Sequence, residues 1–283
     1  MPSEDTSTAR LKRRTAQRYS LLWSQGDPTA APAEYHYDRV SRLLPAGHLR
    51  GRILDAGCGD GIDSLRMAQR GQSAVVSVDL SPGGVAQTRR RTQHLGNVQV
   101  VRGDLERLPL TSDQFDFVYS YGVLHHLPHP ERGLSELLRV LKPGGLLAIY
   151  LYEDFSERTG VERALLRGVN QLRRATVPLP PKVLYGLCRL GSPVVFVCLT
   201  LPARLLARLG QPALSRRIPY HHGAGPFSLA GDLYDRFAAP IEQRYSRSQI
   251  EQWLQRAGLE QVDVAAMRGW VAWGRKPPLA PSR

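Results

Sequence analysis

The chain has 283 residues, 42% of them hydrophobic and 22% charged, and this length suits one large domain or a domain with an elaboration. Such a composition excludes wholesale disorder, collagen-like repeats and a coiled coil. The three cysteines form no CxxC pair, which argues against a disulfide scaffold, a zinc ribbon and an iron–sulfur centre. The polar N-terminus has no apolar segment of the kind that marks a secretory signal, so a cytoplasmic location is expected.

The net charge of +13 is concentrated in one segment of the chain. Ten Lys or Arg residues lie between Arg163 and Arg217, and no Asp or Glu occurs between Glu162 and Asp232. The remainder of the chain carries only about +3. The excess therefore needs a local explanation.

The predicted elements begin with helix and then alternate. Residues 1–20 form a basic arm that leads into a helix, and residues 34–48 have helical spacing. From there, strands alternate with helices at a spacing that indicates βαβ units and a parallel sheet covered on both faces. The predicted strands are 52–55, 74–78, 98–102, 115–120, 146–151, 259–265 and 268–274, and the predicted helices are 62–70, 85–94, 131–141 and 246–257.

The alternation of strands and helices, and its interruption after the fifth strand, divide the chain into four parts. Residues 1–48 form an N-terminal helical arm, and residues 49–152 form an α/β core. Residues 153–245 interrupt the sheet as a basic, apolar helical insertion after its fifth strand. Residues 246–283 supply the last helix and the closing strands.

A glycine-rich loop follows the first strand in the run ILDAGCGDG, from Ile53 to Gly61. Glycines at alternate positions let the backbone turn tightly and approach a ligand closely. The spacing differs from the dinucleotide form GxGxxG, in which a pyrophosphate sits at the helix N-terminus. Asp55 and Asp60 would repel a phosphate there, so the loop suits a ligand with a cationic end.

Three acids stand at the ends of successive predicted strands. Asp55 enters the glycine loop, Asp79 ends the second strand and Asp104 follows the third. A carboxylate at the position of Asp79 can accept hydrogen bonds from two ribose hydroxyls. Asp104 offers an acceptor for an exocyclic amine. Each acid alone could be a helix cap or turn residue, but together they predict one crevice at the carboxyl edge of the sheet.

These motifs resemble class I S-adenosylmethionine-dependent methyltransferases of the small-molecule, type 11-like group. The matching runs are ILDAGCGDG, VSVDLS, GDLERLPLTSDQFDFVYSYGVLHHLPHP and LLRVLKPGGLLAIYLY, which together cover about residues 50–152. The resemblance implies a Rossmann-like, doubly wound sheet of seven strands with the last one antiparallel. The residues it assigns to the cofactor are Asp55, Gly57, Gly59, Gly61, Asp79, Leu80, Asp104, Leu105 and Tyr121.

By the same resemblance each part of this set has a role. The three glycines would contact the methionine part of S-adenosylmethionine, whose amino group Asp55 would orient through its surroundings. The pair Asp79 and Leu80 would hold ribose and adenine, and the pair Asp104 and Leu105 would contact the adenine edge. Tyr121 would contribute backbone near the sulfonium.

Methyl transfer to a hydroxyl or an amine needs removal of a proton, most often by histidine near neutral pH. His125 and His126 follow the fourth strand, over the expected methyl group. In relatives with small acceptors, a histidine at the place of His126 can work with an N-terminal tyrosine, for which Tyr35 or Tyr37 is available. Alternatively, both histidines cap or pack under the following turn.

The insertion contains further candidate residues, which could bind the methyl acceptor. His222 follows another histidine and is a candidate for acceptor contact, although an ordinary loop residue fits the same pattern. Tyr234 and Asp235 belong to a D-x-Y-D-x-F stretch similar to ones in methyltransferases of glycan or secondary-metabolite pathways. Neither histidine has a third ligand at zinc-like spacing, so no metal is expected.

A long apolar stretch, residues 183–209, contains a charge-free run of about 14 residues, short of the roughly 20 that span a bilayer. Pro193 and Pro202 are expected to interrupt a single helix. Two hypotheses remain. The insertion is either a helical substrate lid with its arginines in water, or an interfacial surface for anionic membrane or a lipid-linked substrate.

The predicted function is methyl transfer from S-adenosylmethionine, by in-line displacement, to a secondary metabolite, a sugar or a lipid-linked intermediate. The product would be S-adenosylhomocysteine. One alternative is an RNA methyltransferase, suggested by the positive charge but disfavoured by the few aromatic residues in the basic segment. Another is a fold that binds the cofactor without methylation, such as a cyclase or scaffold.

Overall fold

The computed structural model describes residues 6–26, 35–70 and 73–279. The first five residues of the predicted basic arm lie outside these ranges. The chain separates into two compact units. One, the core unit, joins Met1–Ala164 to Pro240–Arg283, and the other, the insertion unit, is Leu165–Ala239.

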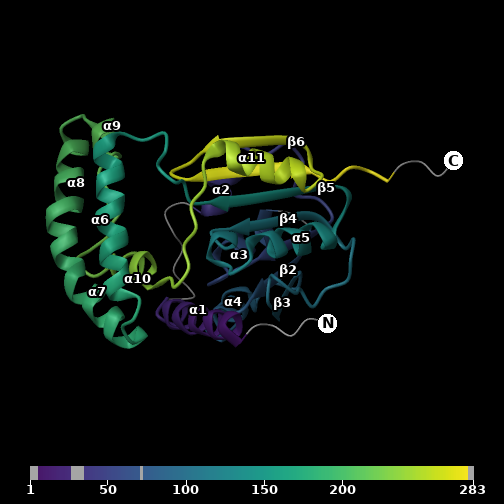
Figure 1. Ribbon diagram of the computed structural model, residues 1–283, viewed down its shortest axis with the longest axis horizontal. Coiled ribbons are helices and arrows are strands. Elements are labelled where there is room, and N and C mark those ends of the chain that lie inside the picture. Colours follow the sequence, from purple (N-terminus) through teal and green to yellow (C-terminus); the bar gives the residue numbers. More distant parts are fainter. Residues whose placement is uncertain (1–5, 27–34, 71–72, 280–283) are drawn as a thin grey trace. The chain divides into compact units, whose positions relative to one another are not determined.

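The core unit is built on a seven-stranded sheet in the order β3-β2-β1-β4-β5-β7-β6 (Figure 1). Six strands run in the same direction, whereas β7 is antiparallel to both of its neighbours, β5 and β6. The predicted doubly wound sheet with an antiparallel closing strand is thereby confirmed. The strands are β1 (Arg52–Ala56), β2 (Ala74–Asp79), β3 (Val98–Arg102), β4 (Phe115–Tyr121), β5 (Leu141–Leu151), β6 (Glu260–Ala266) and β7 (Trp270–Arg275).

Both faces of this sheet are covered, because successive apolar residues of each strand point to opposite sides. In β1, Ile53 and Leu54 are both fully buried but belong to different clusters of the core. The cluster of Leu54 includes side chains of α5 and α11, and that of Ile53 includes side chains of α2 and α3. The helices of the core unit are α1 (Thr6–Ser24), α2 (His36–Ser41), α3 (Ile62–Arg70), α4 (Pro82–Thr92), the 3₁₀ turn η1 (Leu124–His126), α5 (Pro130–Val140) and α11 (Arg247–Arg256).

The helix predicted over 34–48 is shorter than expected. In the structure α2 ends at Ser41, and the residues up to Arg50 form turns and irregular chain. Pro45 and Gly47 lie in this stretch, and Gly47 has a φ of +76°, which a helix does not accommodate.

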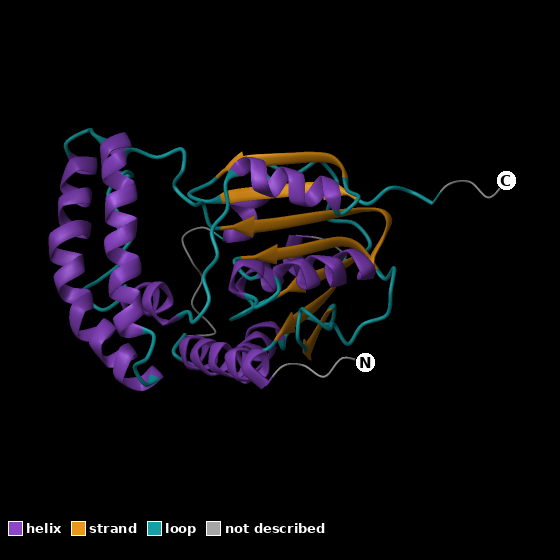
Figure 2. Cartoon of the chain, in the orientation of Figure 1, coloured by secondary structure: helices purple, strands orange, loops and turns teal. Residues whose placement is uncertain are grey.

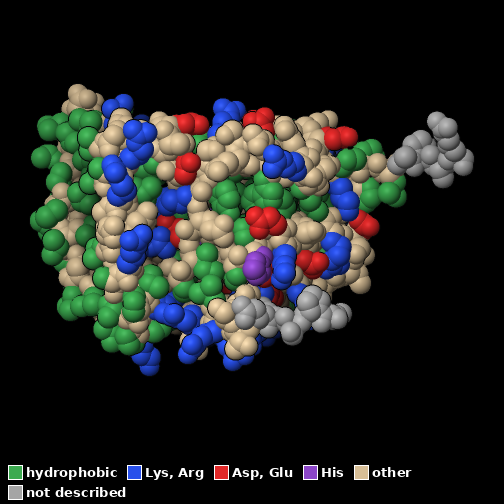
Figure 3. Space-filling model, in the orientation of Figure 1, with side chains coloured by type: hydrophobic (Ala, Val, Ile, Leu, Met, Phe, Trp, Pro, Cys, Tyr) green, Lys and Arg blue, Asp and Glu red, His purple; other side chains and the backbone are tan. Residues whose placement is uncertain are grey.

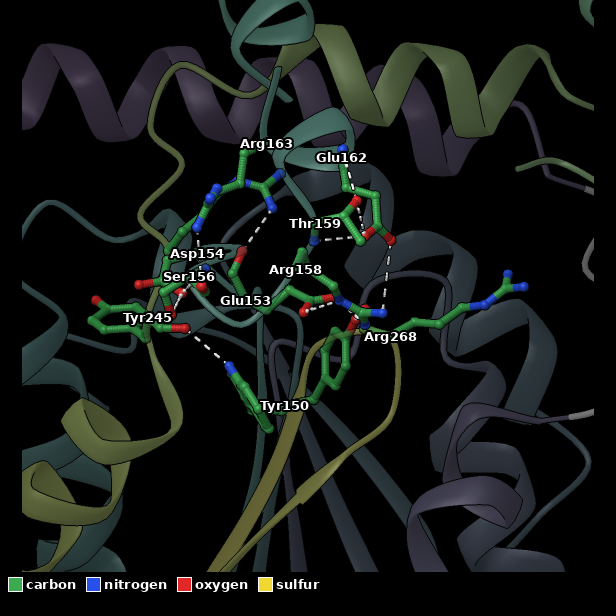
Figure 4. A network of polar contacts seen from close by, with 12 residues as sticks. Tyr150, Glu153, Asp154, Ser156, Arg158, Thr159, Glu162, Arg163, Tyr245 and Arg268 are labelled. Atoms are coloured by element: carbon green, nitrogen blue, oxygen red, sulfur yellow. Dashed lines mark hydrogen bonds and ion pairs between the residues drawn. The ribbon is translucent and has the colours of Figure 1, made fainter. Parts of the chain in front are cut away.

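The two connections between the core unit and the rest of the chain are held by polar contacts (Figure 4). Glu153 forms a bidentate ion pair with Arg158 at 2.9 Å and pairs through its backbone with Tyr245. A capping box between Thr159 and Glu162 then begins α6 (Gly160–Thr176). Because residues 153–164 and 240–245 are tied to the core, the compact insertion is narrower than the segment 153–245.

The insertion unit is helical (Figure 2). It contains most of α6, followed by α7 (Pro181–Val195), the π segment η2 (Phe196–Thr200), α8 (Leu201–Arg208), α9 (Pro212–Ser215) and α10 (Ala230–Ala238). Within this unit α7 packs against α10, and Thr176 at the end of α6 donates a hydrogen bond to the carbonyl of Phe237.

One helix runs unbroken from Pro181 to Arg208, so the expectation that Pro193 and Pro202 interrupt it is wrong. Proline lacks an N–H and crowds the preceding turn, which usually breaks a helix. The π segment forms the turn directly before Pro202, so its wider turn gives room to that ring. Pro193 lies in α7 before the π segment, and the helix continues through it.

Candidate functional site

The loop between β1 and α3 has the backbone conformation that its glycines predict. Gly57, Gly59 and Gly61 have φ values of +86°, +54° and +78°. A Cβ on Gly57 would lie 2.2 Å from Val123, and one on Gly61 would lie 2.7 Å from Thr88. The loop therefore requires glycine for both conformation and space, and it leaves a backbone-lined cradle at the carboxyl edge of the sheet.

Asp79 joins this loop to the start of α4. Its Oδ2 accepts a hydrogen bond from the Gly59 amide at 3.0 Å, and its Oδ1 accepts from the amide and the hydroxyl of Ser81 at 2.7 and 2.6 Å. Burial raises the pKa of Asp79, and these hydrogen bonds oppose the rise. Since an ionised carboxylate can accept about four hydrogen bonds, Asp79 keeps acceptor capacity for a ligand.

A cavity opens beside this carboxylate within the core unit. Its empty space is about 630 Å³, open solvent at the mouth included. The lining comes from the ends of β1, β2 and β4, from the loops that follow β3 and β4, and from α1. The lining residues are Thr15, Ala16, Tyr19, Trp23, Gly57, Asp79, Leu80, Ser81, Asp104, Leu105, Tyr121, Gly122, Val123, His126 and Leu127.

Six of the nine predicted cofactor residues line this cavity. Gly59 and Gly61 of the loop are not among the lining residues, and neither is Asp55. Its carboxylate is buried behind the loop, where it accepts a hydrogen bond from Ser64 at 2.5 Å, and Ser77 in turn donates to Ser64 at 2.8 Å. Burial raises the pKa of Asp55 to about 8. The predicted crevice of three acids is therefore lined by two, Asp79 and Asp104.

Asp60 does not direct its negative charge at a ligand, although the sequence predicted that it would. Its carboxylate pairs with the buried Arg91 at 2.9 Å, and the Arg91 guanidinium also donates to the Asp60 carbonyl. The loop acid is thus neutralised by α4, and it is absent from the cavity lining.

Asp104 enters the cavity as part of an ion pair. Lys12 of α1 donates to Asp104 Oδ2 at 2.7 Å and lies 2.8 Å from Glu106 Oε2. Asp104 Oδ1 accepts from the Glu106 amide, which fixes the carboxylate at the end of the β3 loop. The adjoining Leu105 is buried and contributes an apolar wall.

The contribution of α1 was not predicted from the sequence. Tyr19 and Trp23, one turn apart, both line the cavity, with ring centroids 6.0 Å apart. A Cβ on Gly59 would lie 3.0 Å from the Trp23 ring, so this indole covers the glycine loop. Ser20, on the same helix, accepts a hydrogen bond from the Gly83 amide of α4. The i, i+4 aromatic pair was the available signal, but nothing local indicated where the helix would dock.

His126 lines the cavity and has a defined tautomer. Its Nδ1 lies 2.7 Å from the carbonyl oxygen of Ile241, which can only accept, so Nδ1 carries the proton and Nε2 the lone pair. The ring of Tyr19 lies beside it, with centroids 5.7 Å apart. This pair of aromatic side chains is the arrangement that can move a proton at this end of the cavity.

The other predicted catalytic residues lie elsewhere in the core unit. His125 is fully buried against Tyr152, with ring centroids 4.0 Å apart, and is absent from the cavity lining. Tyr35 lies under the guanidinium of Arg66 and does not reach the cavity lining either. The Tyr37 hydroxyl pairs with His48 in the core. The N-terminal tyrosine beside His126 is therefore Tyr19.

Tyr121 ends β4 at the cavity. Its ring stacks between Tyr150 and His36, with centroid distances of 4.3 and 4.5 Å. Burial raises the pKa of the Tyr121 phenol, which stays protonated. This stack fixes the backbone that leads into Gly122 and Val123.

The three predicted acceptor residues belong to the insertion unit. His222 pairs with Asp232 at 2.7 Å, and both side chains are about half exposed. Tyr234 is buried edge-on against Tyr185, with centroids 5.5 Å apart. Asp235 is partly buried on the same helix, α10. Among the described residues, no three His, Cys, Asp or Glu side chains form a group that could hold a metal ion.

Residues 54–149 match the family described as a methyltransferase domain. Together with the sheet order and the glycine loop, this match shows that the core unit contains a methyltransferase domain of the class I S-adenosylmethionine-dependent kind. The cavity fits that cofactor. The loop leaves no room for a Cβ beside Val123, and the lining includes two carboxylates and an apolar wall, which suit the hydroxyl, amine and apolar groups of S-adenosylmethionine.

Several relatives support the same class. The chain is 36% identical over 119 residues to phthiotriol/phenolphthiotriol dimycocerosates methyltransferase of Mycobacterium leprae, covering 41% of this chain and 44% of that protein. It is 39% identical over 129 residues to demethylmenaquinone methyltransferase of Clavibacter sepedonicus, covering 40% and 52%. A solved structure described as "Conversion of a Disulfide Bond into a Thioacetal Group during Echinomycin Biosynthesis" shares the fold, with a TM-score of 0.51, 19% identity and 94% of both chains covered.

The matches to curated relatives cover only part of each chain, from 34% to 50% of this one. The chain spans about a quarter to a half of the length of the curated relatives it matches, from 26% to 55%. The named acceptors of the relatives also differ from one another.

Proposed function

We propose that the protein transfers a methyl group from S-adenosylmethionine to a small-molecule acceptor, and that His126 removes the acceptor's proton. The observation that carries this proposal is the meeting of Asp79, Asp104 and His126 in one cavity beside the glycine loop. When bound, S-adenosylmethionine supplies a methyl group on an activated sulfonium for in-line displacement, which leaves S-adenosylhomocysteine.

The cofactor-binding residues in this proposal are those the cavity brings together. The backbone of the glycine loop would hold the amino-acid part, and Asp79 would accept from the ribose hydroxyls. Asp104 would accept from the adenine amine, with Leu80 and Leu105 packed on the ring. Asp55, being buried and protonated at neutral pH, would act through the loop and α3 without touching the ligand.

The proton-transfer residues would be His126 and Tyr19. Because Ile241 holds the Nδ1 proton, Nε2 is the nitrogen that can accept a proton from a hydroxyl, an amine or an activated carbon. Tyr19 would orient the acceptor beside that nitrogen, and positioning accounts for much of the acceleration in such displacements. The differing acceptors of the relatives leave open which secondary metabolite, sugar or lipid-linked intermediate is methylated.

Calorimetric titration of S-adenosylmethionine into the full chain, followed by detection of S-adenosylhomocysteine with hydroxyl, amine and RNA acceptors, tests the proposal. We expect one cofactor site per chain and product formation with a small acceptor. Product with RNA alone would make the protein an RNA methyltransferase. Cofactor binding without product in any mixture would favour a scaffold or cyclase, and absence of binding would overturn the proposal.

A further inference from the structure

The outward face of the long helix in the insertion unit is apolar. Its large side chains recur every three or four residues through α7, η2 and α8 and are 43–75% exposed. We call this set the apolar stripe. It consists of Val183, Leu187, Leu190, Val194, Val197, Leu201 and Leu205. In Figure 3, hydrophobic side chains gather along α7 and α8, at the left edge of the view.

The inward face of the same helix is more polar than the stripe. Ser192 and Thr200 are fully buried, and each donates a 2.7 Å hydrogen bond, to the carbonyls of Pro226 and Tyr220. The same inward face also buries Leu184, Cys188, Phe196 and Ala203, so the helix is apolar on both faces. A helix on the surface of a protein in water normally carries polar side chains on its outward face. The surroundings that suit this outward face are therefore apolar.

Basic side chains accompany the stripe. The insertion unit contains ten Lys or Arg but only two Asp and no Glu. Arg189 and Arg204 are exposed on the long helix, where Arg189 lies over Phe227 and Arg204 donates to the carbonyl of Gly223. Figure 3 shows further Lys and Arg side chains over α6. This excess of positive charge complements an anionic surface.

We propose that the apolar stripe lies in the headgroup region of an anionic lipid bilayer, with the long helix parallel to the membrane plane. The stripe is buried among acyl chains and glycerol groups, and the arginines remain in contact with lipid phosphates. This contact surface belongs to the insertion unit alone and does not depend on which acceptor the core unit methylates.

Two other environments suit the stripe less well. By length and composition alone the helix could cross a membrane, with a mean hydropathy of 1.7. However, Arg189 and Arg204 are only about 22 Å apart along the helix axis, less than the roughly 30 Å of a hydrocarbon core, and its other face is packed on protein. A second copy would bring basic flanks together, and like charges oppose that association.

Flotation of the full chain with vesicles of neutral phosphatidylcholine, or of phosphatidylcholine with phosphatidylglycerol, tests the proposal. The stripe variant combines Leu190→Glu, Val194→Glu and Val197→Glu. Its control places the same three negative charges on exposed positions of the core unit, as Gln252→Glu, Gln255→Glu and Gln261→Glu. Circular dichroism and light scattering on the same samples report folding and oligomeric state.

We expect binding to the anionic vesicles only, a loss of about a hundredfold in the stripe variant, and retention in the control. Absence of vesicle binding by the parent protein, or equal loss in the control, would overturn the proposal. The proposal would also be overturned if the parent protein were a dimer and the stripe variant a monomer, because a second copy would then cover the stripe. Resistance of the parent protein to alkaline carbonate extraction from vesicles would instead indicate a spanning helix.

Discussion

The core unit and the insertion unit use apolar residues in opposite ways. In the core unit, Ile53 and Leu54 alternate between two buried faces of a sheet, and polar groups gather at one edge, each with hydrogen-bond partners. In the insertion unit, Leu187 and Leu190 face outward while Ser192 is buried. The core therefore carries a binding site in the usual way, whereas the insertion presents a surface that water does not suit.

The largest expected effect tests the polar edge of the core unit. Replacing His126 by alanine should lower turnover by about 10²- to 10⁴-fold, because the acceptor's proton has no base. Affinity for S-adenosylmethionine should remain close to that of the parent protein. Steady-state production of S-adenosylhomocysteine and calorimetry provide the two measurements.

A pH profile separates this role from a structural one. The profile of rate against pH should differ in shape between His126→Ala and the parent protein, because a general base acts only in its unprotonated form. His94→Ala, at an exposed position of the core unit, is the control and should keep the parent profile. An unchanged rate for His126→Ala would remove this residue from the reaction.

The contrast between the units is tested most directly with two leucines of the same helix. Leu184 is 2% exposed and Leu187 is 52% exposed. Leu184→Ala should lower the free energy of unfolding by about 2–5 kcal/mol, since it leaves a cavity. Leu187→Ala should change it by less than about 0.5 kcal/mol in water. Denaturant titration of both variants measures the two effects, and equal losses would mean that the stripe is covered by protein.

Asp79 provides the next effect in size. Asp79→Ala should weaken binding of S-adenosylmethionine by about 1–3 kcal/mol, since charge-assisted hydrogen bonds to the ligand are lost. The exposed Asp263→Ala on β6 is the matched control. Calorimetry that gives the same affinity for Asp79→Ala and the parent protein would place Asp79 outside the site.

The sequence predicted the core unit well because its signals are local. The apolar β-branched runs 74–78 and 98–102 both became strands: 74–78 lies inside the sheet between two neighbours, and 98–102 pairs with it at the edge. The glycines and Asp79 stand at strand ends, where chain order alone places them at one edge. Asp55 carries the same signal but is buried behind the loop, where Ser64 donates to its carboxylate and Ser77 donates to Ser64.

The features that the sequence did not predict depend on packing between segments that are distant in the chain. Tyr19 and Lys12 reach the cavity because α1 docks on α4, which no periodicity in residues 1–20 indicates. The helix continues through Pro193 and Pro202 with a π segment directly before Pro202, and that π segment has no sequence signature of its own. In both cases the sequence pattern correctly predicted a helix. Where α1 docks, and whether the long helix continues through its prolines, could not be predicted from that pattern.

The smallest expected effect is on the pH dependence of the unfolding free energy, and it comes from the buried carboxyl group of Asp55. The pKa of Asp55 is raised from 3.8 to about 8 by burial, so the folded state holds this proton more tightly than the unfolded chain. Its contribution to stability is therefore present at acidic pH and is lost as pH rises toward 8. Asp55→Asn keeps the acceptor for Ser64 and removes the titration.

Between about pH 6 and pH 8 the parent protein should lose on the order of 1–2 kcal/mol more unfolding free energy than Asp55→Asn. Asp63 and Asp79, whose pKa values are also raised by burial, contribute the same slope to both proteins, so only the difference reports Asp55. Denaturant unfolding at the two pH values measures it, with Asp263→Asn as the exposed control. Parallel curves would mean that Asp55 is ionised in the fold, which would require a cationic partner such as the amino group of a bound ligand.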